Sequence, residues 1–545
     1  MGTGTGTGTG MSSSKPDCFR RQVVKMRSPL SRLTLRIRGA GVPVAGLLVM
    51  ASAGAYGQEA VSGAGPETRV SIVPRVSITE TLTDNVRLTS TGQQAEQITE
   101  TSAGIRISIN GAKLKTFFDY SLRNVMYAQS SSPDSTQYQN GLNTFGTLEM
   151  VDHWAFVDFS GAISQQAVSA FGTQSIDNTS INANRAEVSN YRLSPYVRGR
   201  LGGLVSYEAR YTRTVTSSDA VAGSNVATSD GIVKISGDSS FRNLGWSADA
   251  SQQDVNYSAG RPTEADRLNL GLSYLVTPQF IVSANAGREA NNYTSFDKQS
   301  YDTSGFGMNW SPSEMTKLSA SLSHRSFGDA HSLNFAHRTA RTAWTYTDSK
   351  DIVVTPNQIG FASLGSIYDI LFSQFASIEP NPLARAQLVN AFLQANGVSP
   401  NTSVISSVLT SAVSLQRRQD LSFALLGVRD TITFIATRGE ISRLDILSTG
   451  VDDFTTSSLV RQRGFSVSYA HRLTPDYSLS ILASQQNTSG DLSLQATTLR
   501  SLNANVTGKV GKRATVSVGL RHVVSSSDTS PYVENAIIGS LNVQF

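Results

Sequence analysis

The chain has 545 residues, of which 39% are hydrophobic, and it carries 46 lysines and arginines against 41 aspartates and glutamates, for a formal net charge of +5. No stretch after residue 57 approaches the roughly 18 to 20 consecutive apolar residues of a transmembrane helix, so the composition argues against a helical membrane protein. The lone cysteine excludes a disulfide framework. Three classes remain: an outer-membrane barrel, a secreted β-repeat protein and a passenger-like adhesin.

Residues 1–57 are predicted to be a low-complexity start followed by a signal peptide. A Gly-Thr repeat precedes basic residues such as Lys25 and Arg27, a short apolar stretch and a series of small residues, which is the order of a secretory signal. We expect the true start at Met11 or Met26, and cleavage after Gly57 or, as a second choice, after Ala53.

Removal of this leader changes the charge argument. Residues 1–57 hold eight lysines and arginines and one aspartate, so the remainder carries 38 basic and 40 acidic side chains. The basic pI then belongs to the leader, and no nucleic-acid partner is expected. Cys18 lies upstream of the apolar stretch, so lipidation and thiolate metal sites in the exported chain are not expected either.

Period-two alternation of apolar and polar residues recurs along most of the exported chain, as in residues 268–276 and 516–521, and is typical of half-buried strands. Short turn sequences such as residues 277–279 alternate with longer polar connections such as residues 129–139 and 172–183. Tight turns at one end and longer loops at the other are the asymmetry of outer-membrane barrels, and a secreted sandwich is not expected to sort its loops in this way.

We therefore predict an all-β fold: a large transmembrane antiparallel β-barrel over residues 74–545, after a periplasmic segment at 58–73. The strand count is about 20, with an even number expected. About 14 strands precede residue 363 and about seven follow residue 396. That total is odd, so one assignment is wrong, and we place the error near residues 401–419.

Residues 363–396 break the pattern with a helical period, interrupted by Pro380 and Pro382. Two short amphipathic helices are predicted, either as a plug or cap over the pore or as a packed loop excursion.

The last strand alternates and stops on an aromatic residue. Ile537, Leu541, Val543 and Phe545 share one parity, and a terminal phenylalanine on such a strand is typical of outer-membrane barrels. We predict that these residues form the C-terminal signal for the barrel-assembly machinery.

Because lipid requires an apolar outer face, the polar parity is assigned to the lumen. The charged candidates for lining it are Glu208, Arg210, Arg267, Arg325, Arg338, Arg472 and Arg521. An alternative is that such charges pair with one another as structural bridges. Aromatic residues expected in interfacial girdles are Trp246, Trp310, Trp344, Tyr346, Tyr469 and Tyr477.

No catalytic, cofactor-binding or metal-binding constellation stands out, so neither enzymatic activity nor a cofactor is expected. The sequence at 237–240, Gly-Asp-Ser-Ser, resembles the block that opens a lipase family but falls in a predicted turn. His324, His331 and His337 bracket one predicted hairpin without the spacing of a metal site.

Several short sequence segments resemble those of the outer-membrane β-barrel family associated with PEP-CTERM/exosortase systems. Members of this family are encoded among exopolysaccharide genes in Gram-negative bacteria. The segments cover residues 73–86, 194–196, 287–289, 310–314, 324–328 and 415–418, within a resemblance that extends over residues 70–545. At 380–382 the chain reads Pro-Asn-Pro where the family pattern has an acidic residue between the prolines. The resemblance implies a role in exopolysaccharide or biofilm-matrix export, and implies no catalytic residue.

Two functional hypotheses follow. The first is a porin-like passive channel or export component that selects by lumen width and lining side chains. The second is a non-conducting structural or adhesive protein that binds matrix polymer or a partner, and an outer-membrane hydrolase is a third, remote alternative. The expected partners are outer-membrane lipid, the assembly machinery, and polysaccharide or periplasmic export proteins.

Overall fold

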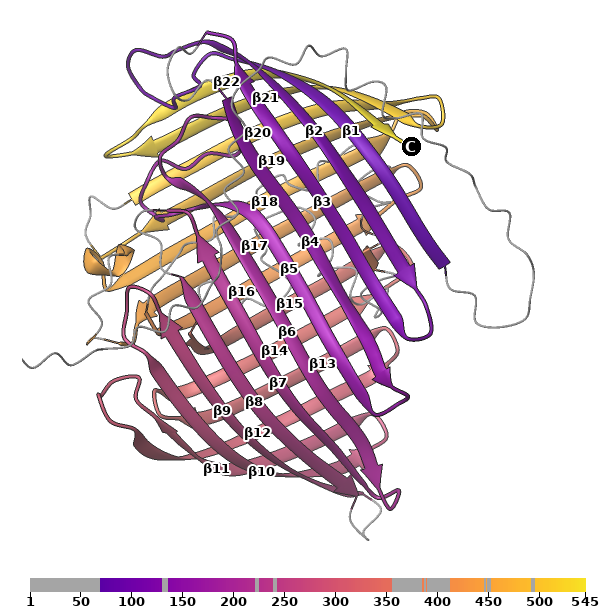
Figure 1. Cartoon of the computed structure of the whole chain (residues 1–545), viewed down its shortest axis with the longest axis vertical. Coiled ribbons are helices and arrows are strands. Elements are labelled where there is room, and N and C mark those ends of the chain that lie inside the picture. The colour runs from indigo at the N-terminus through magenta and orange to yellow at the C-terminus, as the bar shows by residue number, and fades with distance from the viewer. Residues whose placement is uncertain are drawn as a thin grey trace, which may run out of the picture. The chain divides into compact units, whose positions relative to one another are not determined.

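The computed structural model describes residues 69–129, 136–220, 225–238, 243–354, 385–386, 389, 412–445, 447, 452–491 and 496–545. These residues form one antiparallel sheet of 22 strands. The sheet closes on itself because β1 (Arg69–Thr83) pairs with both β2 (Glu96–Asn110) and β22 (Tyr532–Gln544), as the indigo and yellow strands of Figure 1 show. Closure leaves no open sheet edge, which a lipid environment requires.

Each strand pairs with its neighbours in the chain. From the third to the twelfth they are β3 (Leu114–Tyr127), β4 (Thr136–Val151), β5 (Ala155–Ala167), β6 (Arg185–Leu201), β7 (Val205–Ser218), β8 (Val226–Asp238), β9 (Leu244–Tyr257), β10 (Thr263–Thr277), β11 (Phe280–Asn291) and β12 (Gln299–Ser313). They continue with β13 (Thr316–Arg325), β14 (Gly328–Arg338), β15 (Thr342–Val353), β16 (Ser414–Leu426), β17 (Asp430–Arg443), β18 (Leu459–Arg472), β19 (Tyr477–Ser489), β20 (Ala496–Val510) and β21 (Ala514–Ser527). A short 3-10 helix, η4 (Asp453–Thr455), precedes β18.

The all-β barrel and the even strand number are confirmed, and the count of about 20 is corrected to 22. The error lies before residue 363, where 15 strands replace the predicted 14, and not near residues 401–419, since seven strands follow as predicted. β1 begins at Arg69, so residues 69–73 belong to the barrel and not to a periplasmic segment. The predicted leader lies outside the described residues, as does most of the segment 363–396. Within that segment Arg385, Ala386 and Val389 are helical.

The two ends of the barrel differ in their connections. At one end, the turn end, short links such as residues 278–279 and 314–315 join the strands, and the first strand starts and the last strand stops there. At the other end, the loop end, longer links run over residues 168–184 and 444–458, although β13 and β14 are joined there by residues 326–327 alone. Tight turns face the periplasm in outer-membrane barrels, so the turn end is the periplasmic end.

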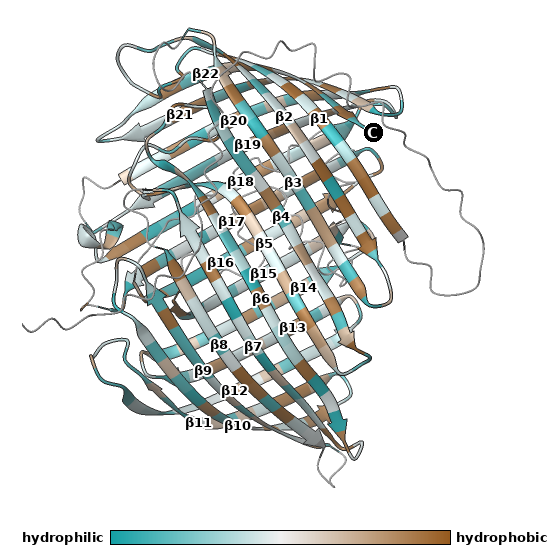
Figure 2. Ribbon diagram, viewed as in Figure 1, coloured by the Kyte–Doolittle hydropathy of each residue, from teal (hydrophilic) through white to brown (hydrophobic). Residues whose placement is uncertain are grey.

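Hydrophobic and hydrophilic residues alternate along many strands, as the colours of Figure 2 show, so the two faces of the sheet differ in polarity. On β10, Leu268, Leu270 and Leu272 are 53%, 58% and 57% exposed. Arg267 and Asn269 alternate with them on the opposite face. A closed sheet with exposed leucines outside and polar groups inside is stable in lipid. No helix among the described residues is long and apolar enough to cross a membrane.

An aromatic girdle surrounds the outward face at the turn end. The register places all of the aromatic residues predicted for girdles on the outward face, within five residues of the turn end of their strands: Trp246, Trp310, Trp344, Tyr346, Tyr469 and Tyr477. The Trp344 ring lies 4.2 Å from that of Phe423, and the Trp154 indole donates a hydrogen bond to the Tyr207 hydroxyl at 3.0 Å. Amphipathic rings are favoured at the membrane interface.

Some girdle rings lie over glycines of the neighbouring strand. A Cβ atom added to Gly508 would lie 2.5 Å from Cε1 of Tyr477, and one added to Gly199 would lie 2.7 Å from the Tyr207 hydroxyl oxygen. Glycine at these positions lets the aromatic ring cover the backbone of the adjacent strand.

Candidate functional site: the lumen face and the loop layer

The inward face of the barrel carries the charged residues that the sequence pattern assigned to the lumen. The register places all of them on the face opposite the exposed apolar side chains: Glu208, Arg210, Arg267, Arg325, Arg338, Arg472 and Arg521. This placement follows from the period of two along each strand, because residues opposite one another in the ladder share a face.

Basic residues outnumber acidic ones among the described inward side chains. By the register, the bases are Arg75, Arg106, Lys115, Arg123, Arg192, Arg198, Arg200, Arg210, Lys234, Arg267, Lys317, Arg325, Arg338, Arg418, Arg443, Arg472, Lys509 and Arg521. The acids are Glu96, Glu100, Asp119, Glu149, Asp158, Glu208, Asp230, Asp249, Glu289, Asp351, Asp420 and Glu534. The lumen face therefore has a basic excess.

Most of the inward acids are bound by arginines. Arg210 contacts Asp158 at 2.7 Å and Glu208 at 3.0 Å. Arg325 holds Glu289 at 3.0 Å and Asp351 at 2.6 Å. Further pairs join Asp119 to Arg75 and Arg106, Glu100 to Arg123, and Asp420 to Arg418. The interpretation of these charges as structural bridges thus applies to some of the predicted lining residues, and it leaves a surplus of bases.

Part of that surplus lies at the turn end, where we define a turn-end basic ring. It consists of the inward bases within five residues of the turn end of their strands, except Arg106 and Arg210, which pair with acids: Lys115, Arg198, Arg200, Lys234, Lys317, Arg338, Arg472 and Lys509. All are exposed except Arg338, which is partly exposed. The acids of the same band are engaged, because Asp158 and Glu208 bind Arg210, and Glu149 accepts the backbone N–H of His153. The ring is therefore a local concentration of positive charge on the lumen face.

At the loop end, the connection 168–184 between β5 and β6 folds against inward side chains of distant strands. The Tyr127 hydroxyl of β3 donates to the carbonyl of Thr179 at 2.7 Å, and the Gln139 amide of β4 donates to the carbonyl of Asn178 at 2.7 Å. The Tyr532 hydroxyl of β22 donates to the carbonyl of Gln174 at 2.5 Å. Since these tyrosines and Gln139 face inward, this loop lies against the inner wall.

A buried ion-pair cluster fixes the middle of this loop. The Arg521 guanidinium contacts Asp177, and it also contacts Glu534 at 2.6 Å; Arg521 and Glu534 side chains are each 5% exposed. Burial opposes ionisation of Asp177, but the guanidinium groups of Arg521 and Arg185 and hydrogen bonds from Ser180 outweigh it and hold the Asp177 pKa well below its usual range. Asp177 is therefore ionised in the folded protein.

The start of the same loop is bound to the connection 444–458 between β17 and β18. Asp453 accepts hydrogen bonds from the Ser169 hydroxyl at 2.5 Å and from the Ala170 N–H at 2.6 Å. Ala170 also packs with the buried Phe454 and with Val460 of β18. Burial raises the pKa of Asp453. β5 and β17 lie almost opposite each other in the strand order, so this contact joins distant parts of the mouth.

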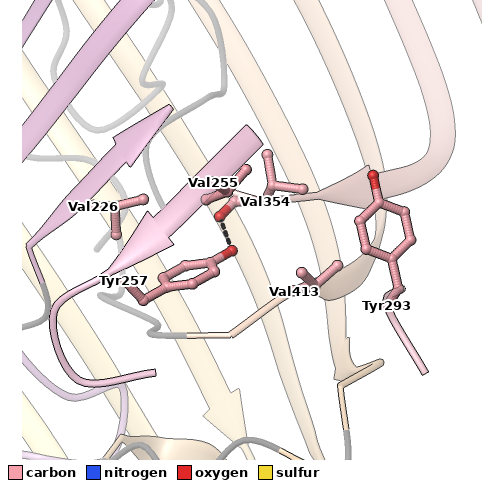
Figure 3. Close-up of a cluster of buried hydrophobic side chains, with 6 residues drawn as sticks. All are labelled: Val226, Val255, Tyr257, Tyr293, Val354 and Val413. Carbon is pink, nitrogen blue, oxygen red and sulfur yellow. Dashed lines mark hydrogen bonds between the residues drawn. The ribbon is translucent and has the colours of Figure 1, made fainter. Parts of the chain in front are cut away.

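The connection 444–458 also reaches the other half of the barrel. Asp445, which is 1% exposed, binds the Arg261 guanidinium of the β9–β10 loop at 3.4 Å. Beside it lies a buried cluster drawn in Figure 3, in which the Tyr257 hydroxyl points at and donates to the carbonyl of Val354. Its members are Val226, Val255, Tyr257, Tyr293, Val354 and Val413. These contacts bring the β9–β10, β11–β12 and β17–β18 loops together.

We call the described residues of 168–184, 258–262, 292–298 and 444–458 the loop layer. Their contacts connect widely separated strands at the loop end. A plug or cap, or a packed loop excursion, was predicted only for residues 363–396. Residues 172–183 were predicted as a long polar connection, but their inward fold was not. Asp177 followed by polar residues indicates a turn, and its carboxylate accepts hydrogen bonds from the backbone N–H groups of Thr179 and Ser180. Its partner Arg521 is remote in sequence and gives no local signal.

The imidazoles that bracket β14 face outward and bind single partners. Asp329 lies 2.9 Å from His324, Asp348 lies 3.0 Å from His331, and the Thr316 hydroxyl lies 2.9 Å from His337. Among the described residues, no group of three or more histidine, cysteine or acidic side chains is arranged to hold a metal ion.

The C-terminal strand closes the barrel. Ile537, Leu541, Val543 and Phe545 share the outward parity, and the Phe545 N–H donates to the carbonyl of Pro74 at 2.9 Å. Phe545 is 44% exposed, so its ring is accessible from outside the barrel.

No family model and no curated protein matches the chain. Among solved structures it is similar to the siderophore receptor PirA from Pseudomonas aeruginosa, with a TM-score of 0.42 and 9% identity over 88% of this chain and 81% of that one. PirA from Acinetobacter baumannii gives 0.46 and 9% over 87% and 80%, and the outer-membrane protein opdK from Pseudomonas aeruginosa gives 0.33 and 8% over 87% and 99%. The closed sheet, its apolar outer face and its sorted turns and loops identify the chain as a 22-stranded β-barrel of the outer membrane.

Proposed function

We propose that the protein is a passive outer-membrane channel or export component linked to secretion of exopolysaccharide or biofilm matrix, and that it belongs to the PEP-CTERM/exosortase-associated barrel family that its sequence resembles. The observation that carries the transport proposal is the polar inward face, with a ring of mostly exposed bases around one mouth. A barrel of 22 strands is in the size range that encloses a lumen, either aqueous or plugged. Hydroxyl, amide and charged side chains on that face would select the solute.

In this proposal the barrel carries out no chemical reaction and needs no cofactor. A solute crosses down its gradient or is driven by a periplasmic export protein. The loop layer would restrict the far mouth, because its buried ion pairs and hydrogen bonds fix loops that run between distant strands. The C-terminal strand with Phe545 would be presented to the barrel-assembly machinery.

A second candidate function is a non-conducting structural or adhesive role, and the loop layer is the observation that favours it. Arg521 and Asp445 are almost completely buried, which indicates a tightly held mouth. If that mouth never opens, the outer surface of the loops would bind matrix polymer or a partner. A hydrolase at the rim remains the remote third candidate.

Conductance separates these candidates. The purified chain and a variant lacking residues 363–396 are inserted into planar bilayers, and single-channel currents are recorded. The channel proposal predicts stepwise conductance in at least one of them, with a larger step in the deletion if that segment obstructs the lumen. If both proteins are folded and neither conducts, the channel proposal fails.

The link to matrix secretion has a separate test. A strain without the gene is predicted to retain polysaccharide in the periplasm and to lose matrix, and plasmid-borne expression is predicted to restore it. Unchanged export in the deletion strain would contradict the link.

A further inference from the structure

We infer that the barrel takes up an anionic polymer, a glycan bearing carboxylate, sulfate or phosphate groups, at its turn-end mouth, and that the turn-end basic ring is the recruiting site. The inference rests on the proposed channel function and specifies its substrate class and its direction of entry. The evidence for it is the distribution of charged side chains on the inward face.

The position of the ring indicates from which side of the membrane the anionic polymer enters the barrel. The described chain enters β1 and leaves β22 at the turn end, and the tight turns lie there, so this mouth opens to the periplasm. The ring includes positions on β3, β6, β8, β13, β14, β18 and β20, so it surrounds the mouth and is not confined to one side. A chain leaving the periplasm would meet these bases first.

The charges of the ring are available to a ligand. Lys234, Lys317 and Lys509 are exposed, and no ion pair involves them among the described residues. Lys234 lies between Glu208 and Asp249 in the ladder, but Arg210 binds Glu208 and the Asn269 amide donates to Asp249. The other acids of the band, Asp158 and Glu149, are bound by Arg210 and by the backbone N–H of His153. A mouth lined by one sign of charge raises the local concentration of counter-ions about 10- to 1000-fold.

The long connection between β15 and β16 supplies little counter-charge. Between residues 355 and 411 the chain contains only Asp369, Glu379 and Arg385 as charged residues. That segment is nearly neutral, so it leaves the excess of inward bases intact wherever it lies.

The geometry favours a flexible polymer over a folded acidic partner. The ring side chains face inward, where a single extended chain that enters the mouth can reach several of them. A protein docked on the turns would meet a surface of mixed sign first, because Lys113 is paired there with Asp152 at 3.1 Å and the acids Glu314 and Asp476 are exposed. A repeating anion engages several weak sites at once, and such binding gains strength from multivalency.

The first test measures ion selectivity and block in planar bilayers. In a potassium chloride gradient the reversal potential is predicted to show preference for chloride over potassium. Oligogalacturonate, a carboxylated glycan, is then added to one chamber at a time, with a neutral maltooligosaccharide of equal length as the comparison. The inference predicts block by oligogalacturonate at a concentration about tenfold below that of the neutral oligomer, and stronger block from the turn-end side.

The test variant is Lys234→Gln/Lys317→Gln/Lys509→Gln. It is predicted to reduce the chloride preference and to raise the blocking concentration of oligogalacturonate about tenfold, while block by the neutral oligomer is unchanged. The matched control, Lys350→Gln/Arg463→Gln/Arg500→Gln, removes the same number of charges from the outward face and is predicted to behave as the unmodified protein. The outward assignment of these positions follows from the register.

Failure of the inference and failure of the channel proposal are distinguishable. A folded protein without conductance overturns the channel proposal. A conducting protein that prefers cations, or that oligogalacturonate and the neutral oligomer block equally, overturns the inference alone. If oligogalacturonate blocks the test variant as strongly as the unmodified protein, the inference is overturned as well. If an acidic protein, and no glycan, binds the mouth in a way that depends on the ring, the assigned substrate class is wrong.

Discussion

Replacement of Arg521 by methionine tests the role of the buried ion-pair cluster in holding the loop 168–184. The guanidinium contacts both Asp177 of the loop and Glu534 of β22, and its side chain is 5% exposed. Removal of one partner of a buried pair costs about 3 to 5 kcal/mol because a charge is left uncompensated. Glu534 stays in the wall whether the loop is bound or released, so only the part belonging to Asp177, about 2 kcal/mol, acts on the loop.

A change of about 2 kcal/mol corresponds to about a 30-fold increase in the population of the released loop, at 1.4 kcal/mol per factor of ten. The assay uses a cysteine in place of Asn178, whose backbone carbonyl, and not its side chain, accepts the Gln139 bond. The chain's single cysteine, Cys18, lies in the predicted leader, so exported protein has no background thiol. The labelling rate by a membrane-impermeant maleimide is predicted to rise about 30-fold in the Arg521→Met protein.

The control is Arg210→Met, which breaks an inward ion pair with Asp158 and Glu208 at the turn end and does not touch the loop. It is predicted to leave the labelling rate unchanged. Migration of the unheated protein on a gel verifies that each variant is a folded barrel. A rise of less than twofold in a folded Arg521→Met barrel would refute the assignment of the cluster as the tie that holds the loop.

Two further predictions concern other parts of the barrel. Gly508→Val places a side chain against the Tyr477 ring, with Cβ only 2.5 Å from the ring. It is predicted to lower the free energy of unfolding, measured by urea titration, by about 1 to 3 kcal/mol. The double variant with Tyr477→Ala is predicted to recover part of this loss, and no recovery would contradict the contact. The pH dependence of the bound loop follows from Asp177, whose pKa is lowered by folding. The ionised carboxylate stabilises the bound loop fully above its unfolded pKa near 4, and this stabilisation is lost as the pH falls through the lower folded pKa. The labelling rate at position 178 is divided at each pH by the rate for the same cysteine in urea-unfolded protein, because the reactive thiolate becomes scarcer as pH falls. This ratio is predicted to be constant from about pH 8 to 5 and to rise only below about pH 4, and a rise beginning near pH 6 would contradict the cluster.

The parts of the structure that depend on local pattern were predictable from the sequence. Alternation along β10 gives the outward leucines and the inward Arg267 and Asn269 directly, because a strand has a period of two. The same parity argument placed the girdle tryptophans and the C-terminal residues on the outward face.

The parts of the structure that depend on contacts between residues far apart in the sequence were not predictable. Asp177 meets Arg521, and Arg261 meets Asp445, only because strands far apart in sequence face one another across the closed sheet. Loop length and polarity identify a connection such as 168–184 but do not tell whether it folds inward. The same limit applies to the charges, since the sequence did not distinguish Arg210, which is bound by two acids, from Lys234, Lys317 and Lys509, for which no ion pair occurs among the described residues.

The central claim is that one parity of each strand faces lipid and the other faces the lumen, and cysteine scanning along β10 tests it most directly. Single cysteines replace residues 268, 269, 270, 272 and 273 in the protein reconstituted in lipid. We expect a charged, water-soluble thiol reagent to modify the cysteines at 269 and 273, and a lipid-soluble quencher to reach labels at 268, 270 and 272. Equal modification at adjacent positions, or the opposite alternation, would contradict the assignment of the lumen face and every conclusion built on it.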